Sequence, residues 1–323
     1  MSTSLNIAIA AEFDLCEKIA AFLEQSDLAV DKLAIVEIYP FREEQGVRFN
    51  RKAVEQIALD EVEWAEINYL LFAGEFSHLV HLARAAGTGC VVVDMKGICS
   101  ALSDVPVVVP SVNDEQLTEL RQRNIVALPN PQVGQLALAV RPLLQEYDVT
   151  QLMVTSLLPA SYTNAEQVTK LVGQSAQLLN GIPLDEGQPR LAFNVFPAAP
   201  QNLAGQLQRI FPSLDNVVFH QIEAPVFYGL GQMVSLSSNY ELNDETVLEQ
   251  WRQNPLIQYH SEQMITPVGN GETENGEDNV YLHISNLSMR ENRLEFWTVA
   301  DEQRFNMALL AVKLVELIYR QGY

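Results

Sequence analysis

The stretch from Asn124 to Tyr147, NIVALPNPQVGQLALAVRPLLQEY, decides how this chain folds. A β-branched segment breaks at Pro129-Asn130-Pro131, and apolar residues then recur at helical spacing from Val133 onward. Asn130 is a good N-cap, and Pro131 falls at the first helical position, where a missing N–H costs nothing. The pattern predicts a strand that leads into the N-terminus of a buried helix.

Such a helix N-terminus favours an anion, because its free N–H groups and the helix dipole point toward it. An enzyme with this arrangement would place a nucleophile there, for example a cysteine whose thiolate the helix stabilises. This chain carries Pro131 at that position. The question of function therefore depends on Pro131, which stands where an enzyme would place its nucleophile.

The composition limits the classes of protein to consider. A chain of 323 residues is long enough for two domains, and no apolar run approaches the roughly 18 residues of a membrane span. The net charge of −21 repels nucleic acid and anionic lipid, so we expect neither as a partner. Cys16, Cys90 and Cys99 occur singly, without the spacing of a disulfide framework or a metal site. The start lacks the basic region of a signal peptide, and we expect a cytoplasmic protein.

Short β-rich runs alternate with helical patterns in the first part of the chain. Because parallel strands need crossover helices, this alternation predicts a doubly wound, Rossmann-like α/β domain with a parallel sheet. The expected strands are Asn6–Ala10, Leu33–Tyr39, Ile67–Ala73, Gly89–Asp94, Val105–Val109 and Ile125–Leu128, with helices over Asp14–Gln25 and Phe76–Ala86.

The rest of the chain predicts an α+β domain with an antiparallel or mixed sheet. We expect the first domain over residues 1–129, completed by a closing helix in 301–323, and the second over 130–300. The expected strands are Gln151–Leu158, Leu191–Phe196, Asn216–Gly229, Gly231–Asn239, Tyr281–Ser285 and Arg293–Val299; the helices are Asn164–Leu179, Asn243–Gln253 and Asp301–Arg320; and Val268–Asn279 is an acidic surface loop.

The turn after the first strand reads Ala10-Ala11-Glu12-Phe13-Asp14, and no glycine precedes Gly46. A dinucleotide-binding turn needs glycines so that the backbone can approach the pyrophosphate. Here the Cβ atoms block that approach, and the carboxylates of Glu12 and Asp14 add negative charge where the phosphates would lie. A contact between two like charges at about 4 Å costs roughly 4 kcal/mol at an effective dielectric of about 20. We therefore expect no dinucleotide cofactor in the usual pose, with Asp14 serving as a helix N-cap.

Six motifs carry a resemblance to a known family. They are VVVD (Val91–Asp94), VPVVVPSVN (Val105–Asn113), PNPQ (Pro129–Gln132), LAFNVFP (Leu191–Pro197), APVFYG (Ala224–Gly229) and WTVADEQR (Trp297–Arg304). Over nearly its whole length the chain resembles the aspartate-semialdehyde dehydrogenase family, and within it the bacterial Usg branch. The resemblance implies a second domain that pairs two subunits, hence a homodimer or mixed assembly with an active semialdehyde dehydrogenase.

The enzymes of that family use NADP and phosphate to interconvert an aspartyl phosphate and its semialdehyde through a thioester on a cysteine. By resemblance, Pro131 stands at the position of that cysteine. The positioning glutamine corresponds to Leu158, the substrate-binding arginine to Glu223, the acid/base histidine to Leu230 and the phosphate-binding arginine to Ser100. A prolyl ring has no thiol, so acyl transfer cannot take place there.

This pattern predicts a pseudoenzyme with no catalytic residue, no cofactor and no metal, which acts through interaction. Two alternatives stay open: an NADP-dependent semialdehyde dehydrogenase of altered chemistry in amino-acid biosynthesis, and a small-molecule-binding module in a remodelled cleft.

Several other side chains carry groups that could form a site, and for each of them we expect a structural role. We expect Cys99 to be a buried, inert thiol and His220 to make a hydrogen bond within a sheet. We expect no metal at His78 and His81 and no anion site at Lys96 and Arg304. We expect the former cleft to have collapsed into core rather than to form an apolar pocket; its side chains are those of Leu157, Leu158, Pro159, Leu230 and Met233.

Overall fold

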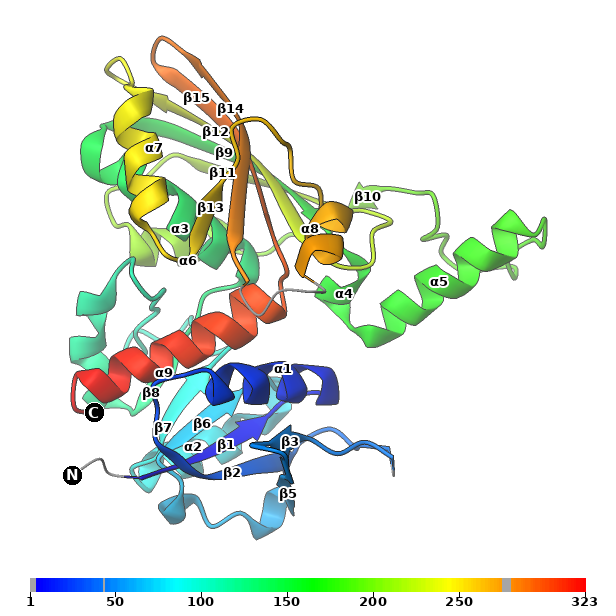
Figure 1. Cartoon of the computed structure of the whole chain (residues 1–323), viewed down its shortest axis with the longest axis vertical. Helices are drawn as coiled ribbons and strands as arrows, with labels where there is room; N and C mark the ends of the chain where they lie inside the picture. Colours follow the sequence, from blue (N-terminus) through cyan, green and yellow to red (C-terminus); the bar gives the residue numbers. More distant parts are fainter. Residues whose placement is uncertain (1–3, 43, 275–279) are drawn as a thin grey trace. The chain divides into compact units, whose positions relative to one another are not determined.

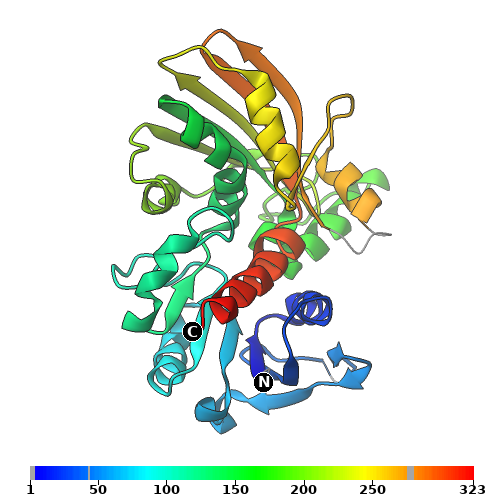
Figure 2. The ribbon, with the colours of Figure 1, turned by 60° about the vertical axis from the view of Figure 1, so that its left-hand side comes forward.

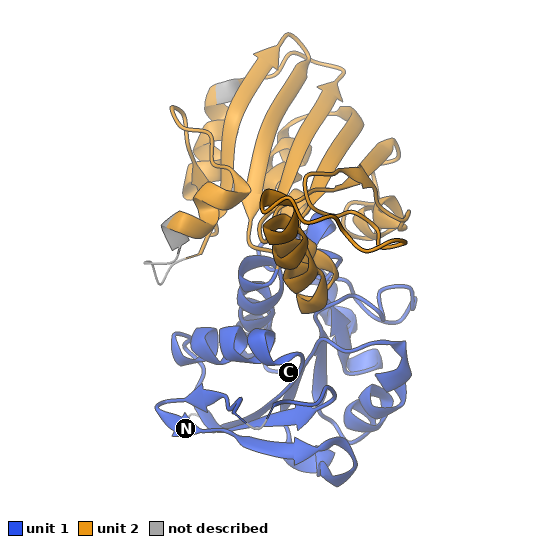
Figure 3. Ribbon diagram, turned by 90° about the vertical axis from the view of Figure 1, so that its right-hand side faces the viewer, with its two compact units in different colours: residues 1–134, 303–323 blue, residues 135–302 orange. Residues whose placement is uncertain are grey.

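A computed structural model describes residues 4–42, 44–274 and 280–323 of the chain. The chain forms two compact units, which are coloured separately in Figure 3. Unit 1 contains residues 1–134 and 303–323, and unit 2 contains residues 135–302. Within the described residues, no helix has the length and apolar content that crossing a bilayer requires.

Unit 1 is built on a parallel six-stranded sheet in the order β5-β2-β1-β6-β7-β8. The chain winds outward from β1 in one direction and then in the other, which is the strand order of a Rossmann fold. The central strands are apolar without alternation because both faces of the sheet are buried. The strands are β1 (Leu5–Ala10), β2 (Val30–Glu37), β5 (Glu55–Ala58), β6 (Tyr69–Phe72), β7 (Val91–Asp94) and β8 (Ile125–Ala127), beside a small hairpin of β3 (Arg48–Phe49) and β4 (Lys52–Ala53).

The helices of unit 1 come from both ends of the chain. α1 (Phe13–Glu24) packs against a π-helical turn, η5 (Arg304–Leu309), and against α9 (Leu310–Arg320), as Figures 1 and 2 show. α2 (Leu79–Gly87) lies against β7. Short 3₁₀ helices are η1 (Leu59–Glu61), η2 (Trp64–Glu66), η3 (Phe76–His78) and η4 (Asp114–Gln122).

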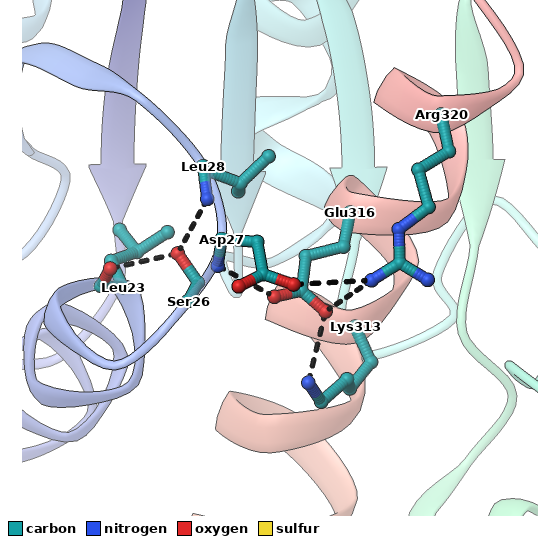
Figure 4. Close-up of polar contacts among 7 residues, drawn as sticks. All are labelled: Leu23, Ser26, Asp27, Leu28, Lys313, Glu316 and Arg320. Atoms are coloured by element: carbon teal, nitrogen blue, oxygen red, sulfur yellow. Dashed lines mark hydrogen bonds and ion pairs between the residues drawn. The ribbon is translucent and has the colours of Figure 1, made fainter.

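A buried acid ties the C-terminal helix into unit 1 (Figure 4). The Glu316 carboxylate accepts a hydrogen bond from the backbone N–H of Asp27 at 3.2 Å and pairs with the Lys313 ammonium at 2.9 Å. The Arg320 guanidinium lies 3.6 Å away on the same helix face. These contacts explain why residues separated by nearly the whole sequence belong to one compact unit.

Unit 2 is built on a mixed seven-stranded sheet in the order β10-β11-β9-β12-β15-β14-β13. β9 and β11 are parallel, β12 is antiparallel to β9 and to β15, and β13 is parallel to β14. The strands are β9 (Val149–Leu158), β10 (Phe196–Pro197), β11 (Val217–Glu223), β12 (Leu230–Ser238), β13 (Ile257–Tyr259), β14 (Leu282–Arg290) and β15 (Arg293–Ala300).

One face of this sheet is the core of unit 2. The indole N–H of Trp251 in α7 donates to the carbonyl of Ala139 in α3 at 2.9 Å, which holds these two helices together. The Gln135 amide donates to Thr298 Oγ1 at 2.8 Å, so α3 also bonds to β15. The helices are α3 (Pro131–Glu146, beginning in unit 1), α4 (Ala160–Thr163), α5 (Ala165–Leu179), α6 (Leu203–Ile210), α7 (Asp244–Gln253) and α8 (Pro267–Glu274).

The predicted fold class, a Rossmann-like sheet domain with an α+β domain, is confirmed. Two of the predicted strands are wrong. In Val105–Val109 the ladder is a single bridge from Val107 to Ala127, because Pro106 and Pro110 remove donors. In Leu191–Phe196 only the last residue is in a strand, because Phe193 adopts φ +58°, which breaks an extended run.

Two local predictions are also corrected. Asp14 is not the N-cap of α1, since the helix begins at Phe13 and the capping residue is Glu12, whose side chain makes no cap bond. The ring of Phe13 packs edge-on against Phe41 with centroids 5.3 Å apart, which favours the earlier start. The predicted loop Val268–Asn279 is helical up to residue 274. Near the start of this helix, Thr266 Oγ1 accepts the Gly269 N–H at 3.1 Å. Residues 275–279 lie outside the described residues.

Candidate functional site

The start of α3 is built as its local sequence predicts. Asn130 Oδ1 accepts the backbone N–H of Gln132 at 2.9 Å, and the Asn130 carbonyl accepts those of Val133 and Gly134. Pro131 is the first residue of the helix. The predicted cap and helix start are thus confirmed, and the side chain at this helix end is an unreactive pyrrolidine ring.

Backbone N–H groups of the loop after β7 donate hydrogen bonds to Asp94, the last residue of that strand. The fully buried Asp94 carboxylate accepts the backbone N–H groups of Cys99 at 2.7 Å and Lys96 at 3.2 Å. Burial raises the pKa of Asp94 to about 6, against the lowering effect of these hydrogen bonds. Gly97 has φ +68°, and a Cβ there would lie 2.7 Å from the Leu128 carbonyl oxygen, so this loop needs a glycine.

Cys99, Lys96 and Ser100 are further residues of this loop whose surroundings the structure describes. Cys99 is buried, and burial together with Asp94 raises the pKa of its thiol to about 12, as expected for an inert thiol. The Lys96 ammonium lies 5.9 Å from the ring centroid of Tyr39, in a cation–π contact. Ser100 is buried, and its backbone N–H donates to the Gly97 carbonyl at 3.1 Å.

The first strand-to-helix turn is buried at Ala10 and Ala11, while Glu12 is half-buried and Asp14 is exposed. Ala10 and Ala11 are both 1% exposed, and the backbone N–H of Ala73 donates to the Ala10 carbonyl at 2.8 Å. The Glu12 carbonyl accepts the N–H groups of Leu15 and Cys16, which starts α1. Ala10 and Ala11 are therefore packed against neighbouring backbone where β1 lies beside β6.

In unit 2 the structure brings Leu158 and Glu223 together, since they pair across β9 and β11. Both line a cavity of about 30 Å³, which Pro159 also lines. Burial raises the pKa of Glu223 above its ordinary value. The side chain of Leu230 is fully buried in the core and borders no part of this cavity.

The predicted collapse of the cleft is therefore partial. Leu230 joins the core, whereas Leu158 and Pro159 line a small cavity. Met233 is 40% exposed, because alternation along β12 places it on the other face of the sheet. His220 lies on that same face and is exposed, because it and Met233 both pair with Thr155 of β9.

A buried carboxylate that sequence reasoning missed lies at the end of β15. Glu302 is fully buried and accepts hydrogen bonds from the Ser161 hydroxyl and, at 3.1 Å, from the backbone N–H of Gly229. Burial, with a smaller effect from Asp301, raises the pKa of Glu302 to about 7. The available signal was an acidic pair directly after an apolar strand, in WTVADE.

The histidines weighed as metal ligands make contacts within the protein. His78 Nδ1 accepts the N–H of Glu75 at 3.1 Å, in a capping arrangement, rather than pairing with His81 on a metal. His260 Nε2 and His283 Nδ1 lie 2.9 Å apart and share a hydrogen bond. Among the residues that the structure describes, no three His, Cys, Asp or Glu side chains are grouped as metal ligands.

Comparison with known proteins places the chain in a family. No protein-family model matches the sequence. The USG-1 protein homolog of Haemophilus influenzae is 60% identical over 323 residues, which cover both chains completely. The chain belongs to the Usg branch of the aspartate-semialdehyde dehydrogenase family. The resemblance inferred from the motifs is thereby confirmed.

More distant relatives of this Usg-type protein are named as enzymes. An aspartate-semialdehyde dehydrogenase of Shewanella violacea is 28% identical over 346 residues, again covering both chains completely. The crystal structure of aspartate semialdehyde dehydrogenase II from Vibrio cholerae matches with a TM-score of 0.90 and 27% identity, covering 99% of this chain and 100% of that one. The common fold thus includes both the Rossmann-like and the α+β parts.

Proposed function

We propose that this protein is a non-catalytic member of its family that acts through assembly, as a homodimer or together with an active semialdehyde dehydrogenase. The observation that carries the proposal is Pro131 at the start of α3. By resemblance, this is the position of the family's nucleophilic cysteine. The capped helix is retained here, but proline offers neither a thiolate nor an exchangeable proton.

The other positions that match the family's reaction support the same proposal. Leu158 and Leu230 are buried hydrocarbon side chains, which transfer no proton and bind no charged substrate. Glu223 carries the opposite charge to the arginine that it would replace. Losing one catalytic group costs an enzyme several powers of ten in rate, and here each matched position lacks its group.

We further propose that no dinucleotide binds at the first strand-to-helix turn. Ala10 and Ala11 are packed against neighbouring backbone, so their Cβ atoms occupy the place that glycines leave open for a pyrophosphate. Glu12 adds a negative charge beside it. The alternative is an NADP-dependent dehydrogenase of altered chemistry, which the name of the Shewanella relative favours.

The open face of the unit 2 sheet supports the assembly role (Figure 3). On β9, Thr155 and Leu157 are half-buried and Met153 is 37% exposed, while Met233 on β12 is 40% exposed. Thr155 and Met233 pair directly across the two strands. Exposed apolar side chains on a sheet face, such as those of Met153 and Met233, are stabilised when a second subunit covers them.

Two measurements on protein purified from a host without its own semialdehyde dehydrogenase test the absence of activity. Calorimetric titration with NADP should give no binding heat, and an assay of NADPH formation from aspartate semialdehyde and phosphate should give no turnover. The variant Pro131→Cys should stay inactive, because the other groups are missing too. Turnover by the unmodified protein would support the dehydrogenase alternative instead.

Light scattering after size exclusion tests the assembly. The unmodified chain should elute as a dimer, and Met233→Lys should shift it toward monomer by burying an unpaired charge in the interface. Val172→Lys on α5, where the valine is 50% exposed, is the matched control and should leave the dimer intact. Mixing with a tagged active relative and capturing the tag then tests mixed assembly. A monomer at micromolar concentration would refute the homodimer, and a monomer that also fails to be captured with the active relative would refute the whole proposal.

A further inference from the structure

We propose that the cavity beside Glu223 binds a primary ammonium group at the end of an alkyl chain. This goes beyond assembly, and the evidence for it lies wholly within unit 2. Four segments meet around the cavity: the ends of β9 and β11, the α4–α5 region, and the chain before β10. The lining residues are Leu158, Pro159, Ala160, Thr163, Gln167, Leu171, Leu191, Asn194, Phe196, Glu223, Ala224 and Pro225.

The charge of the cavity is unbalanced. Glu223 is the one charged residue among the described residues that line it. In the described part of the chain, no cation pairs with the Glu223 carboxylate and no hydrogen bond reaches it. A half-buried carboxylate without a partner is costly, and a cation that enters the cavity offsets that cost.

A second acceptor lines the same cavity. The side-chain oxygen of Gln167 is buried and has no hydrogen-bond partner among the described residues. The backbone N–H of Gln167 is already satisfied by the Asn164 side chain at 2.9 Å, so this residue is held in place at the start of α5. An ammonium group carries three donors and no acceptor, which matches one carboxylate and one amide oxygen.

The size of the cavity selects the ligand further. A volume of about 30 Å³ holds about two groups of the size of water, by the measure in which one water needs about 10–15 Å³. This space admits an ammonium group and one adjoining methylene, and it excludes a nucleotide or a quaternary ammonium. Leu158, Leu171 and Phe196 provide an apolar wall for the alkyl stem.

The ammonium can come from a free alkylamine or from a lysine side chain of a protein partner, since the chemistry is shared. The experiment uses the full-length protein and observes methyl and amide resonances by NMR while probes are added at constant ionic strength. The probes are n-propylammonium chloride for the free amine and Nα-acetyl-lysine amide for the lysine. Tetramethylammonium chloride and sodium propionate are the controls for shape and charge.

We expect saturable shifts confined to the cavity residues with n-propylammonium and none with tetramethylammonium or propionate. Glu223→Gln should weaken binding at least tenfold, and Gln167→Leu should weaken it several-fold. Glu262→Gln, an exposed acid elsewhere in unit 2, is the matched control and should bind as the unmodified protein does. Tighter binding of the lysine derivative than of propylammonium identifies a protein partner as the source, and the reverse identifies a free amine.

The charge-reversed variant Glu223→Arg keeps the test independent of any loss of stability, because it should gain binding of propionate while losing that of propylammonium. Equal binding of propylammonium by the unmodified protein and Glu223→Gln would overturn the proposal, as would the absence of any saturable shift. These outcomes concern the cavity alone, so they are separate from the tests of catalytic activity and of dimer formation.

Discussion

The buried acid Glu302 should make the stability of unit 2 depend on pH. Its pKa is raised from the ordinary value of 4.5 to about 7, mainly by burial. Because the folded state then binds a proton more tightly than the unfolded state, the stabilisation is fully present below pH 4.5 and is lost as pH rises toward 7. The variant Glu302→Gln removes the titrating group and keeps one acceptor oxygen, which can take the Gly229 N–H while the amide NH₂ donates to the Ser161 hydroxyl.

The magnitude follows from the two pKa values. A difference of about 2.5 corresponds to about 3 kcal/mol across the whole window, at 1.36 kcal/mol for each pH unit. At pH 5.5 about 2 kcal/mol of this stabilisation is still present, and nearly all of it is lost by pH 8. The free energy of unfolding of the unmodified protein should therefore fall by that amount relative to Glu302→Gln over this range.

Urea unfolding followed by tryptophan fluorescence measures the difference, since Trp251 and Trp297 both lie in unit 2. Ser161→Ala should steepen the pH dependence, because it removes a donor that lowers the pKa of Glu302. Glu262→Gln, which neutralises an exposed acid, should leave the pH dependence unchanged. If the unmodified protein and Glu302→Gln lose stability in parallel between pH 5.5 and 8, the reasoning about this buried carboxylate is wrong.

Three further predictions concern packing and reactivity. Gly97→Ala should lower the free energy of unfolding by about 2 kcal/mol, because a residue in the left-handed region gains a Cβ at 2.7 Å from the Leu128 carbonyl oxygen. Gly46→Ala, where a Cβ meets no neighbouring atom, is the control, and equal melting temperatures of the two variants would contradict this account. Trp251→Phe should cost about 2 kcal/mol in urea unfolding, since it leaves the Ala139 carbonyl without its buried donor, and an unchanged midpoint would count against it. The three cysteines, all buried and each with a pKa of about 12, should react with a thiol reagent only as the protein unfolds, so rapid labelling of the native protein would refute their assignment as inert.

Local sequence signals were sufficient where neighbouring residues decide the conformation. Asn130 and Pro131 predicted the start of α3, and Asn164 and Asn243 cap α5 and α7, because a cap depends on a side chain and on N–H groups two or three residues away. The same reasoning failed at Asp14, where packing of Phe13 moved the helix start. Local propensity is overridden wherever a distant contact supplies more energy.

By itself the sequence determined the alternation of strands and helices, the Rossmann-like sheet, the membership of the family and the proline at the start of α3, since each of these is written in neighbouring residues. Only the tertiary structure decided that Glu302 is fully buried, that Glu316 binds the turn after α1, and that Glu223 and the Gln167 side chain border one cavity. The environment of a charged side chain depends on segments distant in the sequence, and no local pattern records which segments those are.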